Sequence, residues 1–130
     1  MKNILVLIFF CPLLSWAQRD ALSTGTASFY ANKFEGRKTS SGERFCQDSL
    51  TCAHKYLPFG SYIKVTNLSN DSVVIVKVND RLPKSSKRCV DLTRSAAKQL
   101  NFIAKGLTKV RIEVLAEKPK SPTAIERPEN

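Results

Sequence analysis

The sequence is short of the residues from which most metal and nucleophile sites are built. Its 130 residues hold one histidine, His54, and four cysteines, none of them in a C-x-x-C pair. Zinc sites need closely spaced cysteine and histidine ligands, so we predict no metal site and no cofactor. Acidic residues are also scarce, with 11 Asp and Glu against 21 Lys and Arg, which gives a net charge of +10. This balance favours an anionic partner.

Apart from its N-terminus, the chain lacks a long run of apolar residues. Residues 1–17 begin with a positive charge at Lys2, continue in an apolar run that ends at Leu14, and close on the small residues Ser15 and Ala17. This pattern predicts a secretory signal peptide that is cleaved after Ala17. The run is too short for a comfortable transmembrane span, so we expect no stable membrane anchor. The mature protein is predicted to be exported to the periplasm or cell envelope.

Export narrows the partners that the positive charge can have. Nucleic acid is not expected outside the cytoplasm, and the sequence lacks the interleaved aromatic and basic clusters that stack single strands. An acidic polymer of the envelope is one candidate partner, and simple solvation of a small secreted domain is the alternative. At this length the chain holds one domain, which we expect to be a monomer. Cys11 leaves with the signal peptide, so three cysteines remain in an oxidising compartment and at most one internal pair forms.

The patterning of the mature chain is mainly β. Alternating or β-branched residues predict strands at 23–31, 61–68, 72–80 and 105–116, and the two middle strands form a hairpin. Thr93 predicts the N-cap of a short helix that ends near Leu100, and residues 33–45 predict a structured loop. We therefore expect a compact β-barrel domain over 25–116, preceded by a leader at 18–24 and followed by a disordered tail at 117–130.

Alternation also suggests which side chains share a strand face. Cys52 and His54 share one face of their segment, and Cys89 and Asp91 share one face of theirs. If the two segments are neighbouring strands, Cys52 faces Cys89 and His54 faces Asp91. We therefore predict a Cys52–Cys89 disulfide, and Cys46–Cys52 is the alternative pairing.

Five ordered sequence blocks resemble the rare-lipoprotein-A (RlpA) family. The family pattern runs roughly G-x-A-S-x-Y, F-x-G-R-x-T-x-x-G-E-x-F, T-A-A-H-x-x-L-P-F-G-T, V-x-V-N-D-R-G-P and R-x-x-D-L-S-x-A-A. The matching blocks here are GTASFY at 25–30, FEGRKTSSGERF at 34–45, TCAHKYLPFGS at 51–61, VKVNDRLP at 76–83 and RCVDLTRSAA at 88–97. The resemblance covers nearly all of residues 25–115 and implies a six-stranded double-psi β-barrel with one short helix.

The resemblance also implies an activity, that of a lytic transglycosylase which cuts peptidoglycan and prefers glycan strands without stem peptides. Such an enzyme protonates the glycosidic oxygen between MurNAc and GlcNAc. It then takes a proton from the C6 hydroxyl of MurNAc, which closes a 1,6-anhydro ring. No water enters, so one carboxyl can serve as acid and then as base, where most glycosidases use two. The pKa of that carboxyl should be raised by burial or by a nearby like charge.

By the same resemblance, Glu43 and His54 are the leading catalytic pair. Glu43 is expected to be the acid and base, and His54 is expected to orient groups or to stabilise charge. Asp80 and Asp91 are the expected supporting acids. Each also has a structural alternative, since Asp80 could cap a turn and Asp91 could bond Arg88 or the helix start.

Sugar rings are bound by flat apolar faces and hydrogen-bond donors. Tyr30, Tyr56 and Arg81 are therefore the candidate substrate-binding residues, whereas Phe45 and Phe59 are expected in the core.

Leu82 departs from the family pattern, which has glycine at that position. If the family glycine has a positive φ, the loop of this chain must have a different conformation.

Two other functions stay open, a non-catalytic expansin-like barrel that binds polysaccharide and a structural or inhibitor-type barrel. The presence of Glu43, His54 and Asp91 together favours the enzyme.

Overall fold

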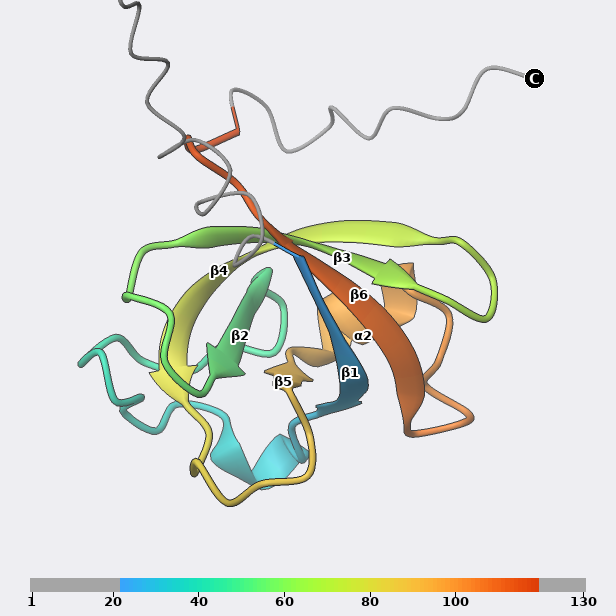
Figure 1. Cartoon of the computed structure of the whole chain (residues 1–130). Helices are drawn as coiled ribbons and strands as arrows, with labels where there is room; N and C mark the ends of the chain where they lie inside the picture. Colours follow the sequence, from blue (N-terminus) through green and yellow to red (C-terminus); the bar gives the residue numbers. More distant parts are fainter. Residues whose placement is uncertain (1–21, 120–130) are drawn as a thin grey trace, which may run out of the picture.

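The computed structural model describes residues 22–119, which form a closed β-barrel with one α-helix (Figure 1). The predicted signal peptide, residues 1–17, lies outside the described residues, as do most of the predicted leader and tail. The six strands are β1 (Leu22–Phe29), β2 (Thr51–His54), β3 (Tyr62–Asn67), β4 (Val73–Arg81), β5 (Val90–Leu92) and β6 (Thr108–Val114). A short 3-10 helix, η1 (Asn32–Phe34), follows β1, and α2 (Arg94–Gln99) follows β5. No helix within residues 22–119 has the length and apolar content to cross a membrane.

The order of the strands around the barrel differs from their order in the sequence. They run β1-β5-β2-β4-β3-β6, and β6 pairs with β1 to close the barrel. The pairs β1/β5 and β2/β4 are parallel, and the other pairs are antiparallel. The short strands β2 and β5 therefore lie between the longer β4 and β1 (Figure 1). The predicted six-stranded, mainly β barrel with one short helix is confirmed.

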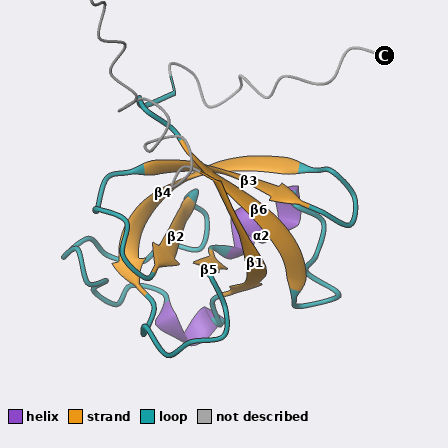
Figure 2. Cartoon of the chain, viewed as in Figure 1, coloured by secondary structure: helices purple, strands orange, loops and turns teal. Residues whose placement is uncertain are grey.

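The predicted hairpin and helix are present, and the local sequence explains both. Strands β3 and β4 are antiparallel neighbours joined by a turn in which Asp71 has a φ of 62°, a left-handed conformation that Asp tolerates better than most residues (Figure 2). The hydroxyl of Thr93 accepts a hydrogen bond from the backbone N–H of Ala96 and so caps α2, as predicted.

The core of the barrel is filled by β-branched and other apolar side chains that alternate with exposed ones along the strands. In β4, for example, Val74, Val76 and Val78 are buried. Helix α2 contributes Ala96 and Ala97, and the fully buried side chains with the largest volumes are Phe102, Ile63, Leu92, Leu100 and Ile112. This core fixes the strands whose outer residues form the candidate site.

Strand β1 closely approaches Cys89, the residue directly before β5, at Gly25. A Cβ atom added at Gly25 would lie 2.8 Å from both the Cβ and the Sγ of Cys89. Contacts this short between non-bonded carbon or sulfur atoms are strongly repulsive, so the position requires glycine for space and not for backbone conformation. Cys89 in turn donates its backbone N–H to the carbonyl of Thr26 and holds β5 against β1.

Strands β2 and β5 are neighbours, which meets the condition on which the predicted disulfide rested, but the alignment that the prediction required is wrong. Cys52 lies opposite Leu92, Ala53 opposite Asp91, and His54 opposite Val90. Paired residues share a face, so His54 lies on the core face with Val90, and Asp91 lies on the other face. The predicted pairs, Cys52 with Cys89 and His54 with Asp91, require parallel strands, whereas β2 and β5 are antiparallel, which is why the expected pairing of His54 with Asp91 does not occur.

The same register does not support the predicted Cys52–Cys89 disulfide. Cys89 directly precedes β5 and is three residues from Leu92, the partner of Cys52, and three residues of extended chain span about 10 Å. A disulfide needs its two Cα atoms within about 7 Å. Cys46, Cys52 and Cys89 are all free thiols in the structure.

Leu82, which replaces the family glycine, does not distort the chain. It is buried, and its backbone N–H donates to the carbonyl of His54. Among residues 22–119, the non-glycine residues with positive φ are Asp71 and Asn101, so Leu82 adopts an ordinary backbone conformation. The segment that carries Asp80 therefore needs no glycine at this position.

Candidate active site

A bulge in β4 aligns two of the predicted acids on one face of the barrel. Cys52 pairs with Val78, but Ala53 pairs with Asp80, so Asn79 is an extra residue between them. Ala53 also pairs with Asp91 on its other side, and Asp91 pairs with Ser28. The row Asp80, Ala53, Asp91 and Ser28 therefore crosses four neighbouring strands. Strands lie about 4.8 Å apart, so the two acids flank the small Ala53 side chain at a Cα separation of about 10 Å.

Asp80 is held by hydrogen bonds from three sides. Its carboxylate accepts the phenolic hydroxyl of Tyr30 and, at 2.9 Å each, the backbone N–H groups of Ser40 and Arg81. Burial by itself would raise the pKa of Asp80, but these hydrogen bonds outweigh it and the pKa is lowered. Burial, and then the hydrogen bond to Asp80, raise the pKa of Tyr30, so its hydroxyl remains a donor.

Asp91 is bound to a guanidinium and a hydroxyl. Arg88 donates through Nε at 2.8 Å and through Nη2 at 3.1 Å, which is a bidentate ion pair, and the Ser28 hydroxyl donates to Oδ1. The structural alternative for Asp91, a bond to Arg88, is therefore present in the structure. This pairing holds the carboxylate in place through charge-assisted hydrogen bonds.

Glu43 reaches β4 from the loop that precedes β2. Its Oε1 accepts from Nζ of Lys77 at 2.9 Å, and its Oε2 accepts from Nδ2 of Asn79 at 3.3 Å. The hydrogen bond from Lys77, then that from Asn79, lower the pKa of Glu43. The expectation of a raised pKa for this carboxyl is therefore wrong for the free protein. The reason is that the Glu43 side chain is 49% exposed beside a cation, and not buried in an apolar pocket.

His54 is a buried, neutral imidazole at the end of β2. Its Nδ1 accepts the backbone N–H groups of Tyr56 and Leu57 at 3.3 Å each, which leaves the ring proton on Nε2. Burial, and the positive charges of Arg81 and Lys55, lower the pKa of His54 to about 4. Within residues 22–119 no partner takes the Nε2 proton and no buried side-chain nitrogen lacks one, so Nε2 reaches solvent as a donor.

Three consecutive residues of β4 connect these groups. Asn79 contacts Glu43, Asp80 contacts Tyr30, and Arg81 donates through Nη1 to the carbonyl of His54 at 3.4 Å. The predicted site residues therefore gather around the end of β4, although His54 and Asp91 lie on different faces. Because of the bulge at Asn79, successive side chains can serve separate parts of the site.

Sequence reasoning missed four residues that contact the predicted ones, namely Ser28, Ser40, Lys77 and Asn79. All four lie inside the quoted sequence blocks, and Ser28 and Asn79 match fixed letters of the family pattern, so their positions were a usable signal. Lys77 and Glu43 are 34 residues apart and share no local pattern. Their contact follows from the fold alone.

Of the aromatic residues that the sequence assigns to the core or the surface, one differs from expectation. Phe45 is buried, as predicted, but Phe59 is 41% exposed and the prediction of a core position is wrong. Phe59 lies in the turn at 57–60, beyond the end of β2, where no second layer covers it. Tyr56 is 67% exposed and contacts the His54 ring edge to face, which agrees with its expected place at the surface.

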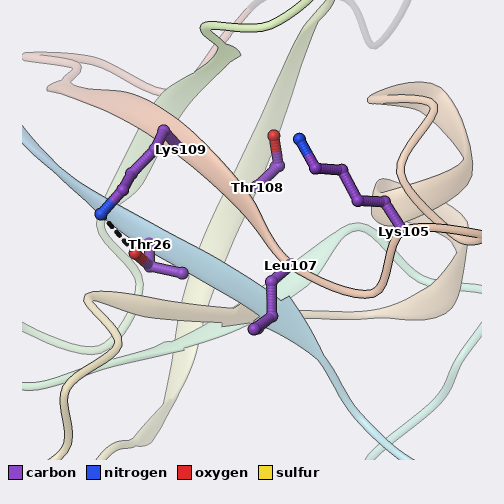
Figure 3. Close-up of a pocket in the computed structure, with 5 residues that line it drawn as sticks. All are labelled: Thr26, Lys105, Leu107, Thr108 and Lys109. Atoms are coloured by element: carbon purple, nitrogen blue, oxygen red, sulfur yellow. Dashed lines mark hydrogen bonds between the residues drawn. The ribbon is translucent and has the colours of Figure 1, made fainter.

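A shallow pocket of about 240 Å³ lies away from this cluster (Figure 3). It is lined by Thr26, Lys105, Leu107, Thr108 and Lys109, and Lys109 donates to the hydroxyl of Thr26 at 2.9 Å. None of its lining residues is a predicted site residue. Within residues 22–119, no group of three or more His, Cys, Asp or Glu side chains is placed to hold a metal ion.

Comparison of the sequence with known proteins identifies the family of this chain. Residues 22–112 match the model of a family described as lytic transglycolase. The chain belongs to this family. Two similar members of the family are named endolytic peptidoglycan transglycosylase RlpA. The protein from Haemophilus influenzae is 50% identical over 97 residues, which is 75% of this chain and 34% of the relative. The protein from Neisseria meningitidis serogroup A is 46% identical over 101 residues, which is 78% of this chain and 42% of the relative. The chain thus spans well under half the length of these curated relatives.

Solved structures support the fold of this family member. The expansin of Clavibacter michiganensis superposes with a TM-score of 0.62 at 18% identity, over 78% of this chain and 53% of the expansin. The Streptomyces papain inhibitor gives a TM-score of 0.59 at 18% identity, over 72% of this chain and 94% of the inhibitor. Together with the closed barrel of six strands, these likenesses establish the double-psi β-barrel fold.

Proposed function

We propose that this protein is an exported lytic transglycosylase that cleaves the glycan strands of peptidoglycan in the periplasm or cell envelope. The proposed product carries 1,6-anhydro-MurNAc ends, and strands without stem peptides are the preferred substrate. The observation that carries the proposal is the gathering of Glu43, Tyr30 and His54 around Asn79, Asp80 and Arg81 in a chain of this family. We further propose that the mature protein acts as a monomer.

In the proposed mechanism Glu43 is the acid and then the base. It gives a proton to the glycosidic oxygen, and it then takes the proton of the C6 hydroxyl as that oxygen closes the anhydro ring. Glu43 is half-exposed and ionised in the free protein, so a bound glycan must cover it for its protonated form to be populated. Covering a carboxylate removes its hydration and raises its pKa, which provides the required change.

The other groups have supporting roles in this proposal. The Nε2–H of His54 donates to a sugar oxygen near the cleaved bond, because Nδ1 is already occupied by two backbone donors. Asp80 fixes the Tyr30 hydroxyl, and Asp91 fixes Arg88 and Ser28 along the row. Tyr30, Tyr56 and Arg81 bind the glycan.

The Lys77→Met variant is expected to shift the pH dependence of cleavage. Lys77 lowers the pKa of Glu43, and cleavage needs Glu43 protonated, so wild-type activity falls as the pH rises through that pKa. Removing Lys77 raises the pKa, and the alkaline fall of kcat/KM should move to higher pH. The measurement is the pH profile of anhydro-MurNAc formation. Lys64→Met, which removes the same charge from β3, should leave the profile in place. An unmoved profile in Lys77→Met would exclude Glu43 as the titrating acid.

The His54→Asn variant tests the neutral state of His54. The asparagine oxygen can replace Nδ1 as acceptor, but the donor at Nε2 is lost, so cleavage should fall about twofold to tenfold, which corresponds to the roughly 0.5–1.5 kcal/mol of one neutral hydrogen bond. With a pKa of about 4, His54 stays uncharged at neutral pH, so neither protein should show an inflection of activity near pH 6.5. A wild-type inflection there that vanishes in His54→Asn would contradict this assignment.

The same pKa has a consequence for stability. The unfolded chain binds a proton on His54 below about pH 6.5, whereas the native protein binds it only near pH 4. Between these values the unfolded state holds more protons, so the free energy of unfolding falls as the pH is lowered. The stabilisation that comes from the neutral His54 is fully present above about pH 6.5. The free energy of unfolding of His54→Asn should therefore lack this dependence on pH.

Incubation of the mature protein with glycan strands stripped of stem peptides, followed by mass spectrometry of the products, tests the proposal. Anhydro-MurNAc ends support it, and reducing MurNAc ends would indicate hydrolysis. The second candidate is a non-catalytic, expansin-like barrel that binds polysaccharide. The ionised state of Glu43 in the free protein is the observation that favours it, and binding without any cleavage would select it.

A further inference from the structure

An exposed patch of two aromatic rings and a guanidinium lies beside His54. We call it the Arg81 patch, and it consists of Tyr56, Phe59 and Arg81. The Cζ atom of Arg81 lies 4.1 Å from the centroid of the Phe59 ring, and the Tyr56 ring contacts the imidazole of His54 at 4.8 Å between centroids. Both aromatic rings remain substantially exposed. Exposed rings beside polar donors are typical of surfaces that bind sugars.

The guanidinium of Arg81 is oriented but has no acidic partner. The ion pairs within residues 22–119 are Lys77 with Glu43 and Arg88 with Asp91. Arg81 makes one side-chain hydrogen bond, to the carbonyl of His54, and its other side-chain N–H groups have no partner among the described residues. No buried side-chain nitrogen there lacks a partner, so these donors face solvent. Stacking on Phe59 limits the motion of the guanidinium, and little conformational freedom is therefore lost when it binds an anion.

The position of Arg81 ties it to the proposed chemistry. Its backbone N–H donates to Asp80 at 2.9 Å, and its side chain is bonded to the residue that supplies the Nε2 donor. An anion held by Arg81 is thus fixed relative to both groups. A planar guanidinium with free N–H groups is well matched to a carboxylate, which it can bind through two parallel hydrogen bonds.

We propose that Arg81 is a specificity-determining residue that binds the free lactyl carboxylate of MurNAc, while Phe59 and Tyr56 contact the sugar. This inference rests on the proposed function. The carboxylate is negatively charged where the stem peptide is absent, and it becomes a neutral amide where a peptide is attached. Arg81 therefore distinguishes the two kinds of strand by charge, at a point adjacent to His54 and Asp80.

The test compares two substrates that differ only at this group, which are stripped glycan strands and the same strands after amidation of their lactyl carboxylates with methylamine. Cleavage and equilibrium binding are both measured for wild type, Arg81→Gln and Arg111→Gln. Arg111 is exposed on β6, so its substitution removes the same charge from a distant surface. Thermal melting confirms that each variant is folded.

Wild type should prefer the free carboxylate by about tenfold to a hundredfold, the range for a charge-assisted hydrogen bond. Arg81→Gln should abolish this preference, whereas Arg111→Gln should retain it. Phe59→Leu should weaken the binding of both kinds of strand by the same factor, so the ratio of their affinities should not change. The inference is overturned if wild type binds and cleaves the two kinds of strand equally well, or if Arg81→Gln prefers the free carboxylate as strongly as wild type does.

The binding measurement separates this inference from the proposed function. If wild type cleaves neither strand but still prefers the free carboxylate in binding, and Arg81→Gln loses that preference, the transglycosylase proposal fails and the role of Arg81 stands. If wild type cleaves both strands equally well and binds them equally, the role of Arg81 fails and the transglycosylase proposal stands.

Discussion

Replacement of Glu43 by glutamine is expected to reduce the cleavage of stripped glycan strands by about 10²- to 10⁴-fold, the usual contribution of a general acid or base. Glutamine has nearly the same size, and its one amide oxygen can still accept the shorter of the two hydrogen bonds, that from Lys77, so the loop should keep its place on β4. It cannot release a proton to the glycosidic oxygen or take one from the C6 hydroxyl. The expected result is a loss of kcat with little change in glycan binding, measured as the rate of anhydro-MurNAc formation.

A matched control for this variant is Glu113→Gln on β6, which makes the same change of charge away from the cluster around β4. It should cleave at the wild-type rate. If Glu43→Gln cleaves as fast as this control, Glu43 is not the acid. If wild type binds glycan without cleaving it, and Glu43→Gln binds equally well, the non-catalytic barrel is the better description.

The Phe102→Ala variant is expected to lose about 3–5 kcal/mol of unfolding free energy, the usual cost of removing a buried phenylalanine. Phe102 is 2% exposed, and its ring contacts that of Phe29 edge to face at 5.7 Å between centroids. It follows α2 directly and joins the helix to the barrel core. Alanine would leave a cavity between these elements, and the lost stability is a large share of the roughly 5–15 kcal/mol of a typical domain.

Urea denaturation measures this effect as a lower transition midpoint with an unchanged slope. Leu68→Ala is the control, because Leu68 is 43% exposed and a surface substitution normally changes stability by less than about 0.5 kcal/mol. Equal midpoints for Phe102→Ala and Leu68→Ala would show that the Phe102 ring does not stabilise the barrel.

Local patterns were sufficient to predict the four longer strands and the helix, but not the short strands β2 and β5. The β-branched run in β4 and the capping hydroxyl of Thr93 determine local structure by themselves, so the hairpin and helix were predictable. The adjacency of β2 and β5 was only a condition of the predicted disulfide. Their antiparallel alignment was not predicted, because alternation shows which residues share a face within one strand and does not show how two strands align.

The charge state of the site depended on contacts that no local pattern contains. Glu43 is ionised because Lys77 lies beside it across 34 residues of sequence. The alignment of Asp80 with Ala53 depends on a bulge at Asn79, and one residue fewer or more there would be invisible to periodicity. Phe59 was assigned to the core from residue type alone, whereas its exposure follows from its position in a turn.

The fit of Gly25 against Cys89 couples two positions that are far apart in the sequence. A Cβ atom at position 25 would lie 2.8 Å from both the Cβ and the Sγ of Cys89, so even alanine there would force the backbone at Cys89 to move. Cys89 directly precedes β5, the strand that carries Asp91. A substitution at Gly25 would therefore disturb the wall of the candidate site without touching any residue of the site itself.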